Sequence, residues 1–588
     1  NVMYAGGGGG ASYGKGTGTP DPQGGAGGQM YHGQGGFGGG GFGNHAAHPS
    51  AHASGGAAGA GVANVGGGGG GSSGVAPGNV AVDGTGAAGG SGIVVVKEKD
   101  KANGVFNMNS QFISNKKGQW PDNRLFDVTG STRYNNEDSP KLTYAVTNPS
   151  AQVFTISMWA KLGDLAGNMG LWSIGKALTG ETGDYSTAEA GFSSAGRLAL
   201  TAYDGVANVN RFNYNTAATG PLYNDPTAWY HFVWAFDMRN ATVGLRTQFY
   251  VNGIDHTTRL TTSTAPAELV NLFDPSGSSI AIGYRLGQNS YMDGYIAEVH
   301  YIDGQQLHCG HFGEPDSDNP TIWRPKQYHG TYGANGLRLE FKQTGTSANA
   351  SGIGADTSGN DNHMAVTNLA AIDVVEDVPS NNFCTLNPLD VYASSGGTLS
   401  EGNTKLVVTT SGLHTAAGTF APTNGKWYWE VELDATDGSN PSNVGISDLS
   451  RDTKANMPSK LAWGYGYNAS TGDKQNSANN SSYGDSYGAG DIVSVAMDLD
   501  NGAVYFAKAG TFQASGDPTS GASKTNAAFT WTPTADMNWC PYVADNTSGV
   551  SFTWLTNFGN PPFAISSGNA DANGFGNFEY APPAGYLA

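Results

Sequence analysis

The stretch Lys426-Trp427-Tyr428-Trp429-Glu430-Val431-Glu432-Leu433 alternates polar and apolar side chains with a period of two residues. Successive side chains of an extended strand point to opposite faces, so the four strongly apolar side chains of this stretch are expected to share one face. Residues 491–498 repeat the pattern and lead into Asp500-Asn501-Gly502, which predicts a hairpin turn because Asn-Gly readily adopts positive φ. The stretch therefore predicts antiparallel β-structure.

The same pattern continues outward through most of the chain. Short alternating stretches bounded by Gly, Asn, Asp and Pro occur at residues 154–160, 197–202, 229–236, 246–251, 279–283 and 294–301. Such spacing favours a sandwich or jelly roll. We therefore predict an all-β protein in which a glycine-rich extended (polyglycine II-like) N-terminal module precedes two antiparallel β-sandwiches. The predicted domains are a glycine-rich module at 1–96, a first sandwich at 97–312, a connector with short strands at 313–395 and a second sandwich at 396–588.

Glycine dominates the N-terminal module, with uninterrupted runs at 6–10, 38–41 and 66–71. Glycine has no side chain to bury, and ordering it costs more backbone entropy than ordering any other residue. Two structures are open to such a segment. It is either a flexible linker or a set of extended three-fold helices that hydrogen-bond to neighbouring strands. His45, His48 and His52 lie in this segment and are interpreted as decoration of its edge rather than as metal ligands.

Composition excludes several classes of function. The 588 residues carry a net charge of −19, which argues against nucleic-acid binding and against adhesion to anionic membranes. No apolar run approaches the roughly 20 residues that span a bilayer, so no membrane insertion is expected. The three cysteines are far apart and odd in number, which implies no disulfide framework. Because Asn1 opens the chain in place of Met, we expect a processed or partial product.

Five stretches of the first sandwich carry a family resemblance, and they are FTISMW at 154–159, WYHFV at 229–233, FYVNG at 249–253, IG at 282–283 and GYIAEV at 294–299. In this order they resemble the laminin-G-like, concanavalin A-like jelly roll, which implies two stacked sheets that often bind glycans or proteins. The fold also includes glucanases that place their carboxylates as Glu-x-Asp-x-Glu on one strand face. Here Glu298 is followed at those positions by His300 and Ile302, and Asp303 is out of phase. We therefore expect no hydrolase activity, and we interpret Glu298 as a polar residue of the last strand.

The stretch at 426–433, Val444-Gly445-Ile446-Ser447 and the hairpin at 498–502 carry a second resemblance. They resemble the SPRY family, a bent β-sandwich that binds partners through loops at one end. The resemblance implies binding without catalysis, so we predict that the protein is not an enzyme.

Aromatic residues on loops are the best candidates for a binding face, because rings anchor interfaces and stack on sugars. The candidate binding residues are therefore Tyr483, Tyr487 and Trp539, together with Asp485 between the two tyrosines. The alternative for the two tyrosines is that they cover a sheet edge. The tryptophans at 427, 429 and 463 are predicted to pack in the core.

Two patterns could indicate a metal. His300, His308, Cys309 and His311 offer nitrogen and sulfur ligands, but the spacing at 308–311 matches no common zinc pattern. Residues 356–362 place oxygen-bearing side chains at alternating positions like a calcium loop, but the later bidentate glutamate is missing. An Asx-rich turn is the favoured interpretation of this loop, with calcium as the alternative. We predict no metal site and no other cofactor.

The glycine runs, with YAG at 4–6 and GIVVV at 92–96, resemble polyglycine regions of tailed-phage adhesins. The connector stretches at 323–326, 332–341, 354–363 and 377–388 resemble the segment between laminin-G-like and SPRY-like domains in marine phage structural proteins. These resemblances imply a virion (extracellular particle) structural protein, a tail fibre or spike, that adheres to a glycan or protein of the host surface. The expected partners are further copies of the chain, with a trimer favoured, and other virion proteins. The alternatives are a capsid or tail decoration protein that binds only virion proteins, and a secreted cellular adhesin.

Overall fold

The computed structural model describes residues 126–588 and, before them, only residues 60, 88, 95–96 and 106–107. Within 126–588 the gaps are 164–166, 179–184, 194–195, 206, 217–221, 317–318, 394–396, 436–441, 449–456, 535 and 548–551. Residues 126–588 form one compact unit and residues 1–125 another. In the latter, β1 (Val95–Val96) pairs with β2 (Phe106–Asn107). Apart from residues 60, 88 and 95–96, the predicted polyglycine module lies outside the described residues, and so do its histidines.

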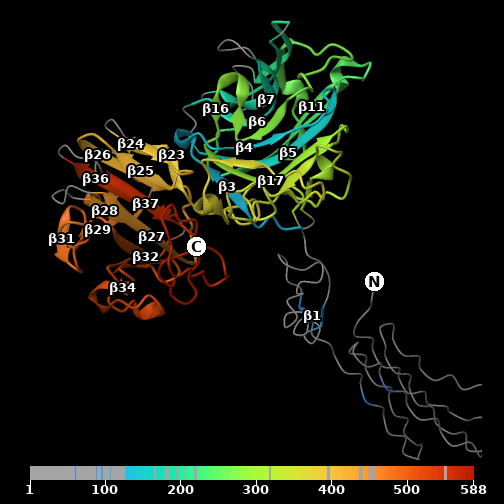
Figure 1. Ribbon diagram of the computed structural model, residues 1–588. Coiled ribbons are helices and arrows are strands. Elements are labelled where there is room, and N and C mark those ends of the chain that lie inside the picture. Colours follow the sequence, from blue (N-terminus) through green and yellow to red (C-terminus); the bar gives the residue numbers. More distant parts are fainter. Residues whose placement is uncertain are drawn as a thin grey trace, which may run out of the picture. The chain divides into compact units, whose positions relative to one another are not determined.

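The first sandwich consists of two antiparallel sheets (Figure 1). Sheet one contains, in order, β12 (Ile254–Asp255), β11 (Thr247–Val251), β10 (Trp229–Asp237), β5 (Val153–Leu162), β17 (Gly294–Asp303), β3 (Ser131–Tyr134) and β22 (Val374–Val375), with β20 (Leu337–Leu339) on β17. Sheet two contains β13 (Leu260–Thr264), β9 (Val209–Thr216), β8 (Arg197–Asp204), β7 (Tyr185–Ser193), β6 (Met169–Ala177), β14 (Ser279–Ile282), β4 (Lys141–Ala145) and β21 (Ala365–Thr367). Two small hairpins accompany them, β15 (Tyr284–Arg285) with β16 (Ser290–Tyr291) and β18 (Gly313–Pro315) with β19 (Trp323–Pro325).

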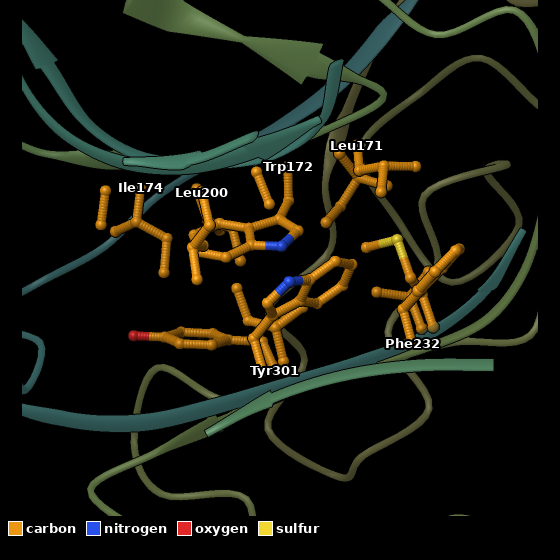
Figure 2. Packing of buried hydrophobic residues seen from close by; sticks show 14 of the residues in the cluster. Leu171, Trp172, Ile174, Leu200, Phe232 and Tyr301 are labelled. Atoms are coloured by element: carbon orange, nitrogen blue, oxygen red, sulfur yellow. The ribbon is translucent and has the colours of Figure 1, made fainter. Parts of the chain in front are cut away.

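Apolar side chains from both sheets fill the space between them. Figure 2 shows Leu171, Trp172, Ile174 and Leu200 facing Phe232 and Tyr301 across this interior. Trp172 lies edge-on to Trp234, with ring centroids 5.8 Å apart, and both are fully buried. Burial of such large rings is the main source of stability of the sandwich.

The residues predicted as a connector contribute strands to the first sandwich. β20 and β22 extend sheet one through β17 and β3, and β21 extends sheet two through β4. The predicted short strands are therefore present, but they do not form a separate connector. β18 and β19 pair with each other, and β23, which also lies within 313–395, pairs with β26 and belongs to the second sandwich.

The second sandwich also has two antiparallel sheets (Figure 1). One contains β23 (Leu386–Ala393), β26 (Gly412–Gly418), β36 (Trp539–Thr547), β28 (Ser442–Asp448), β29 (Gly464–Asn468), β30 (Asp473–Asn476) and β31 (Asn479–Ser482). The other contains β24 (Gly397–Ser400), β25 (Lys405–Val408), β37 (Phe552–Asn557), β27 (Lys426–Ala435), β32 (Asp491–Asp498), β33 (Ala503–Lys508) and β34 (Thr511–Phe512), with β35 (Phe529–Thr530) on β33. The all-β prediction of two antiparallel sandwiches is confirmed. In the described part of the chain the helices are short 3₁₀ turns, and none is long or apolar enough to cross a membrane.

The alternating stretch at 426–433 lies in β27. Its side chains at 429, 431 and 433 enter the core, as the two-residue period predicts. On the opposite face Tyr428 and Glu430 are buried as well, because Phe578 and Tyr586 of the C-terminal segment at 578–588 pack against Tyr428. The carboxylate of Glu430, fully buried, accepts the backbone N–H of Glu579 (2.9 Å) and of Tyr580 (2.7 Å) and holds this C-terminal segment in place.

Candidate functional site

The predicted binding residues do not form an exposed aromatic face. Tyr483, Tyr487 and Trp539 are all less than a tenth exposed and belong to the core of the second sandwich. Only Asp485, between the two tyrosines, is exposed. The prediction of surface rings is therefore wrong for these three residues. The loop that carries Tyr483 and Tyr487 folds back over the sandwich, and Trp539 lies on strand β36, where it packs against other rings.

The two tyrosines anchor their loop to the core strands. The hydroxyl of Tyr487 donates to the backbone oxygen of Tyr467 at 2.7 Å, and the hydroxyl of Tyr483 accepts the backbone N–H of Phe506 at 3.2 Å. The Tyr467 hydroxyl donates in turn to the backbone oxygen of Asp485. Buried tyrosines normally find such partners. The loop is thus held rigid, in keeping with the alternative interpretation that the tyrosines cover a sheet edge.

An open pocket of about 340 Å³ lies in the second sandwich next to the loop at 419–425, which joins β26 to β27. We call it the β26–β27 pocket. Its walls are predominantly aromatic and aliphatic. The lining residues are Cys384, Thr419, Phe420, Ala421, Pro422, Trp427, Tyr428, Trp429, Met497, Pro541, Phe558 and Ala588.

Phe420, Pro422 and Trp427 are half-buried, and Ala421 between them is exposed, so this wall reaches the surface. The pocket has the size and apolar lining of a ligand site. Sequence reasoning placed Trp427 in the core with Trp429. Only Trp429 is fully inside, because Trp427 lies at the end of β27 beside a loop. The sequence signal that could have found the site is Phe-Ala-Pro at 420–422, shortly before a strand whose second residue is Trp427.

Three polar side-chain groups of the pocket wall already have partners within the protein. The indole N–H of Trp427 donates to the backbone oxygen of Asn424 at 2.8 Å. The Thr419 hydroxyl accepts the backbone N–H of Thr385 at 2.9 Å. The hydroxyl of Tyr428 donates to Glu430 at 2.9 Å on the other side of the sheet. The pocket therefore offers mainly apolar surface to a ligand.

An aromatic stack accompanies the pocket on β36. Trp539 and Pro541 are two residues apart on this strand and so point to the same side. The Tyr465 ring, half-buried, stacks on Trp539 (5.1 Å between centroids) and on Phe529 (4.6 Å), and Trp531 packs on Trp539 at 4.9 Å. Trp539 therefore supports other rings and does not itself face solvent.

The first sandwich lacks the carboxylate arrangement of a retaining glycosidase at the strand where we looked for it. A β-bulge interrupts β17 between Ala297 and His300, and Glu298 has a positive φ of 44°. We predicted unbroken alternation along residues 298–303, and the bulge corrects that prediction. Glu298 is buried and pairs with Arg338 (2.7 Å) and His300 (3.1 Å). Burial raises the pKa of Glu298, but His300 and Arg338 outweigh it and lower the pKa overall, whereas a glycosidase acid needs a raised pKa.

A buried serine–histidine pair in the first sandwich has the wrong polarity for a nucleophile. Nε2 of His231 lies 2.8 Å from the hydroxyl of Ser157, and the indole N–H of Trp323 donates to Nδ1 of His231 at 2.9 Å. Because Nδ1 accepts, Nε2 of the neutral ring carries the proton and donates to Ser157. Burial lowers the pKa of His231 to about 3. The imidazole therefore cannot take the proton of Ser157 as a catalytic base would.

The two metal-like patterns have ordinary contacts. Cys309 is buried with its sulfur 3.6 Å from the backbone oxygen of Gly253, and His308 packs edge-on against Tyr250. Asp356 accepts the backbone N–H of Ser358 and Asn362 at 2.8 and 2.9 Å, as in an Asx turn. Among the residues that the structure describes, no group of three or more His, Cys, Asp or Glu side chains could hold a metal ion. The calcium alternative stays a prediction.

Comparison with known families agrees with both sandwiches. Residues 135–305 match the family model of the concanavalin A-like lectin/glucanases superfamily, and residues 426–530 match that of the SPRY domain. A search of curated proteins gave no match.

Solved structures with similar folds include three that overlap about a third of this chain. The SPRY domain of human HERC1 is 16% identical, with 29% of this chain and 96% of that chain covered and a TM-score of 0.24. The TRIM65 PSpry domain is 12% identical (30% and 92% covered, TM-score 0.22), and a heptameric SAP-like pentraxin from Limulus polyphemus is 16% identical (31% and 80% covered, TM-score 0.22). The two matched domain types are typically non-catalytic binding modules.

Proposed function

We propose that this chain is an adhesive structural protein of a virion, a tail fibre or spike, and that its second sandwich recognises a molecule of the host surface. The observation that carries the proposal is the β26–β27 pocket, with Phe420 and Trp427 half-exposed at its rim. Half-exposed rings beside a preformed apolar cavity are the usual anchors of a binding interface. The virion assignment rests on the sequence resemblances of the glycine-rich module and the connector.

The lining of the pocket favours a protein ligand. A sugar offers many hydroxyl groups, and each needs a hydrogen-bond partner when it leaves water. The indole N–H of Trp427 and the hydroxyl of Thr419 are already engaged, so an apolar side chain of a surface protein suits the pocket better. Glycan binding is the second outcome that the experiment distinguishes.

Repetition of the site supports adhesion by a weak pocket. A ligand that fills one apolar pocket gains modest affinity, whereas several linked copies gain a factor of roughly 10²–10⁴ through avidity. We propose a homo-oligomer, with a trimer favoured, for this reason.

The test is binding of the fluorescent full chain to candidate host cells, to the same cells after protease treatment, and to a glycan array. We expect saturable binding that protease treatment of the cells abolishes and that Trp427→Ala and Phe420→Ala weaken at least tenfold. The matched control is Phe575→Ala, which removes an exposed ring that does not line the pocket and should bind as the wild type does.

The other outcomes separate the alternatives. Binding that survives protease treatment and reappears on the glycan array assigns the ligand to glycans. No cell binding at high micromolar concentration, even of a multimerised chain, contradicts the receptor role and leaves the decoration protein. Equal loss in Phe575→Ala and Trp427→Ala contradicts the pocket as the site.

A further inference from the structure

A buried lysine on β5 lies at the centre of a polar cluster on the outer face of sheet one. Lys161 is 1% exposed and Asp377 is fully buried. The ammonium nitrogen Nζ lies 2.9 Å from Oδ2 of Asp377, 2.8 Å from Oδ1 of Asn382 and 3.0 Å from the backbone oxygen of Phe383. An amine, a carboxyl group and a side-chain amide therefore meet within hydrogen-bond distance.

The surroundings hold these groups in place. The indole N–H of Trp229 donates to the second carboxylate oxygen of Asp377 at 3.0 Å. The amide nitrogen of Asn382 donates to the backbone oxygen of Thr227 at 2.6 Å, which turns Oδ1 of the amide toward the lysine. The Tyr295 ring lies beneath Nζ, with its centroid 5.5 Å away.

Water is excluded from Lys161 and Asp377, and Asn382 beside them is half-buried. An apolar cluster covers this face of sheet one, and its buried members are Val128, Trp159, Trp229, Tyr295, Ala297, Val375 and Val378. Burial of two charges carries a desolvation penalty that their mutual attraction must offset. Burial also raises the pKa of Asp377, with Lys161 acting against it, so the carboxyl group is suited to take up a proton.

We propose that Lys161 and Asn382 join in an intramolecular isopeptide bond, with Asp377 moving the proton. Proximity supplies what the reaction lacks in water, because an amine and an amide held in contact react as one molecule. Positioned acid–base groups in a water-excluded site assist the transfer. The cluster needs no further reactant, since amine and amide both belong to the chain.

The step balances as follows in atoms and protons. The ammonium of Lys161 passes one proton to the Asp377 carboxylate, and the free amine attacks Cγ of Asn382. A Cγ–Nζ bond forms, the Cγ–Nδ2 bond breaks, and Nδ2 leaves as ammonia after gaining the hydrogen that Nζ loses. Asp377 carries this hydrogen from Nζ to Nδ2 and is itself left protonated. The products are the amide link, ammonia and a neutral Asp377 carboxyl group.

The bond would tie the middle of sheet one to the segment that leads into β23, the first strand of the second sandwich. A covalent link between distant points of a chain restricts the unfolded state and so resists unfolding. The inference does not depend on ligand binding by the β26–β27 pocket.

The test is tryptic peptide mapping of the full wild-type chain by mass spectrometry under denaturing conditions. We expect the peptide at 142–176, uncut at Lys161, to be joined to the peptide at 343–405. The mass of the joined product should be lower by one ammonia than the sum of the masses of these two peptides. Lys161→Met, Asp377→Asn and Asn382→Ala should each abolish the link. Lys176→Met is the matched control, because Lys176 pairs with Asp274 at the surface (2.6 Å) and its loss should leave the link between Lys161 and Asn382 intact. In this variant the linked peptide should extend to Arg197, since the cleavage site at 176 is lost.

The peptide map of the wild-type chain tests for the Lys161–Asn382 link even if a variant fails to fold. Recovery of separate peptides, with cleavage after Lys161 and an unmodified Asn382, overturns the proposal. A link that has lost water in place of ammonia, with Asp377 as the acyl partner, overturns the assignment to Asn382. Asn382→Ala retains the buried Lys161–Asp377 pair, so a folded Asn382→Ala chain that still carries the link also overturns it.

Discussion

The two sandwiches are built from the same kind of alternating strand, but they differ in where their aromatic side chains end up. In the first sandwich Trp172 and Trp234 are sealed between the sheets. In the second, the aromatic core continues to the surface at the β26–β27 pocket, where Trp427 is half-exposed. The two-residue period therefore determines which side chains face inward, whereas the loops determine whether the interior is closed to solvent.

The largest effect should come from opening the sealed core. Trp234→Ala removes a fully buried indole and is expected to cost about 3–5 kcal/mol of unfolding free energy, since the cavity cannot collapse completely. Trp427→Ala should cost much less because its ring is already partly in water. Urea denaturation of both full-chain variants measures the two losses of unfolding free energy. Equal losses would contradict the difference between a closed interior and one that is open at the pocket.

The closed outer face of β27 gives the next effect. Glu430 accepts the N–H groups of Glu579 and Tyr580, so Glu430→Gln turns an amide NH₂ toward a donor in a fully buried site. We expect a loss of about 2–4 kcal/mol and a released C-terminal segment. Limited proteolysis should cut within 578–588 in the variant and not in the wild type. Asp434→Asn, at an exposed carboxylate of the same strand, serves as the control.

A smaller, pH-dependent effect should distinguish the first sandwich. Burial holds the pKa of His231 at about 3, below its ordinary value of 6.5. As the pH falls below 6.5, the unfolded chain binds a proton at this residue that the folded chain does not. The stabilisation present at neutral pH is therefore lost progressively, by about 2 kcal/mol at roughly pH 5. Denaturant titrations at both pH values should show this loss in the wild type. If His231→Gln shows the same loss, His231 is not its source.

The sequence predicted the architecture because alternation over whole strands is a strong signal. β27 shows both the reach and the limit of that signal. Its inward residues at 429, 431 and 433 were predicted, but burial of Glu430 on the opposite face was not, since it depends on residues about 150 positions away. The bulge at Glu298 was invisible for a similar reason, because no local residue marks a break in register.

The candidate site was harder to predict than the fold. Tyr483, Tyr487 and Trp539 have the composition of a binding loop, yet tertiary packing turns all three inward. Phe420 and Trp427, in contrast, lie where a loop meets a strand end, and a ring at that place can be buried or exposed. Only the arrangement of β26, β27 and β36 in space settles which of the two occurs.

The most direct test of the pocket is site-specific photo-crosslinking of the full chain on intact candidate host cells. One crosslinking side chain replaces Ala421 at the pocket wall, and in a second protein it replaces Leu269, an exposed residue of the first sandwich. We predict that the protein labelled at Ala421 becomes covalently attached to one cell-surface protein, and that Phe420→Ala in the same chain removes this product. Attachment through Leu269 and not through Ala421 would contradict the assignment of recognition to the second sandwich.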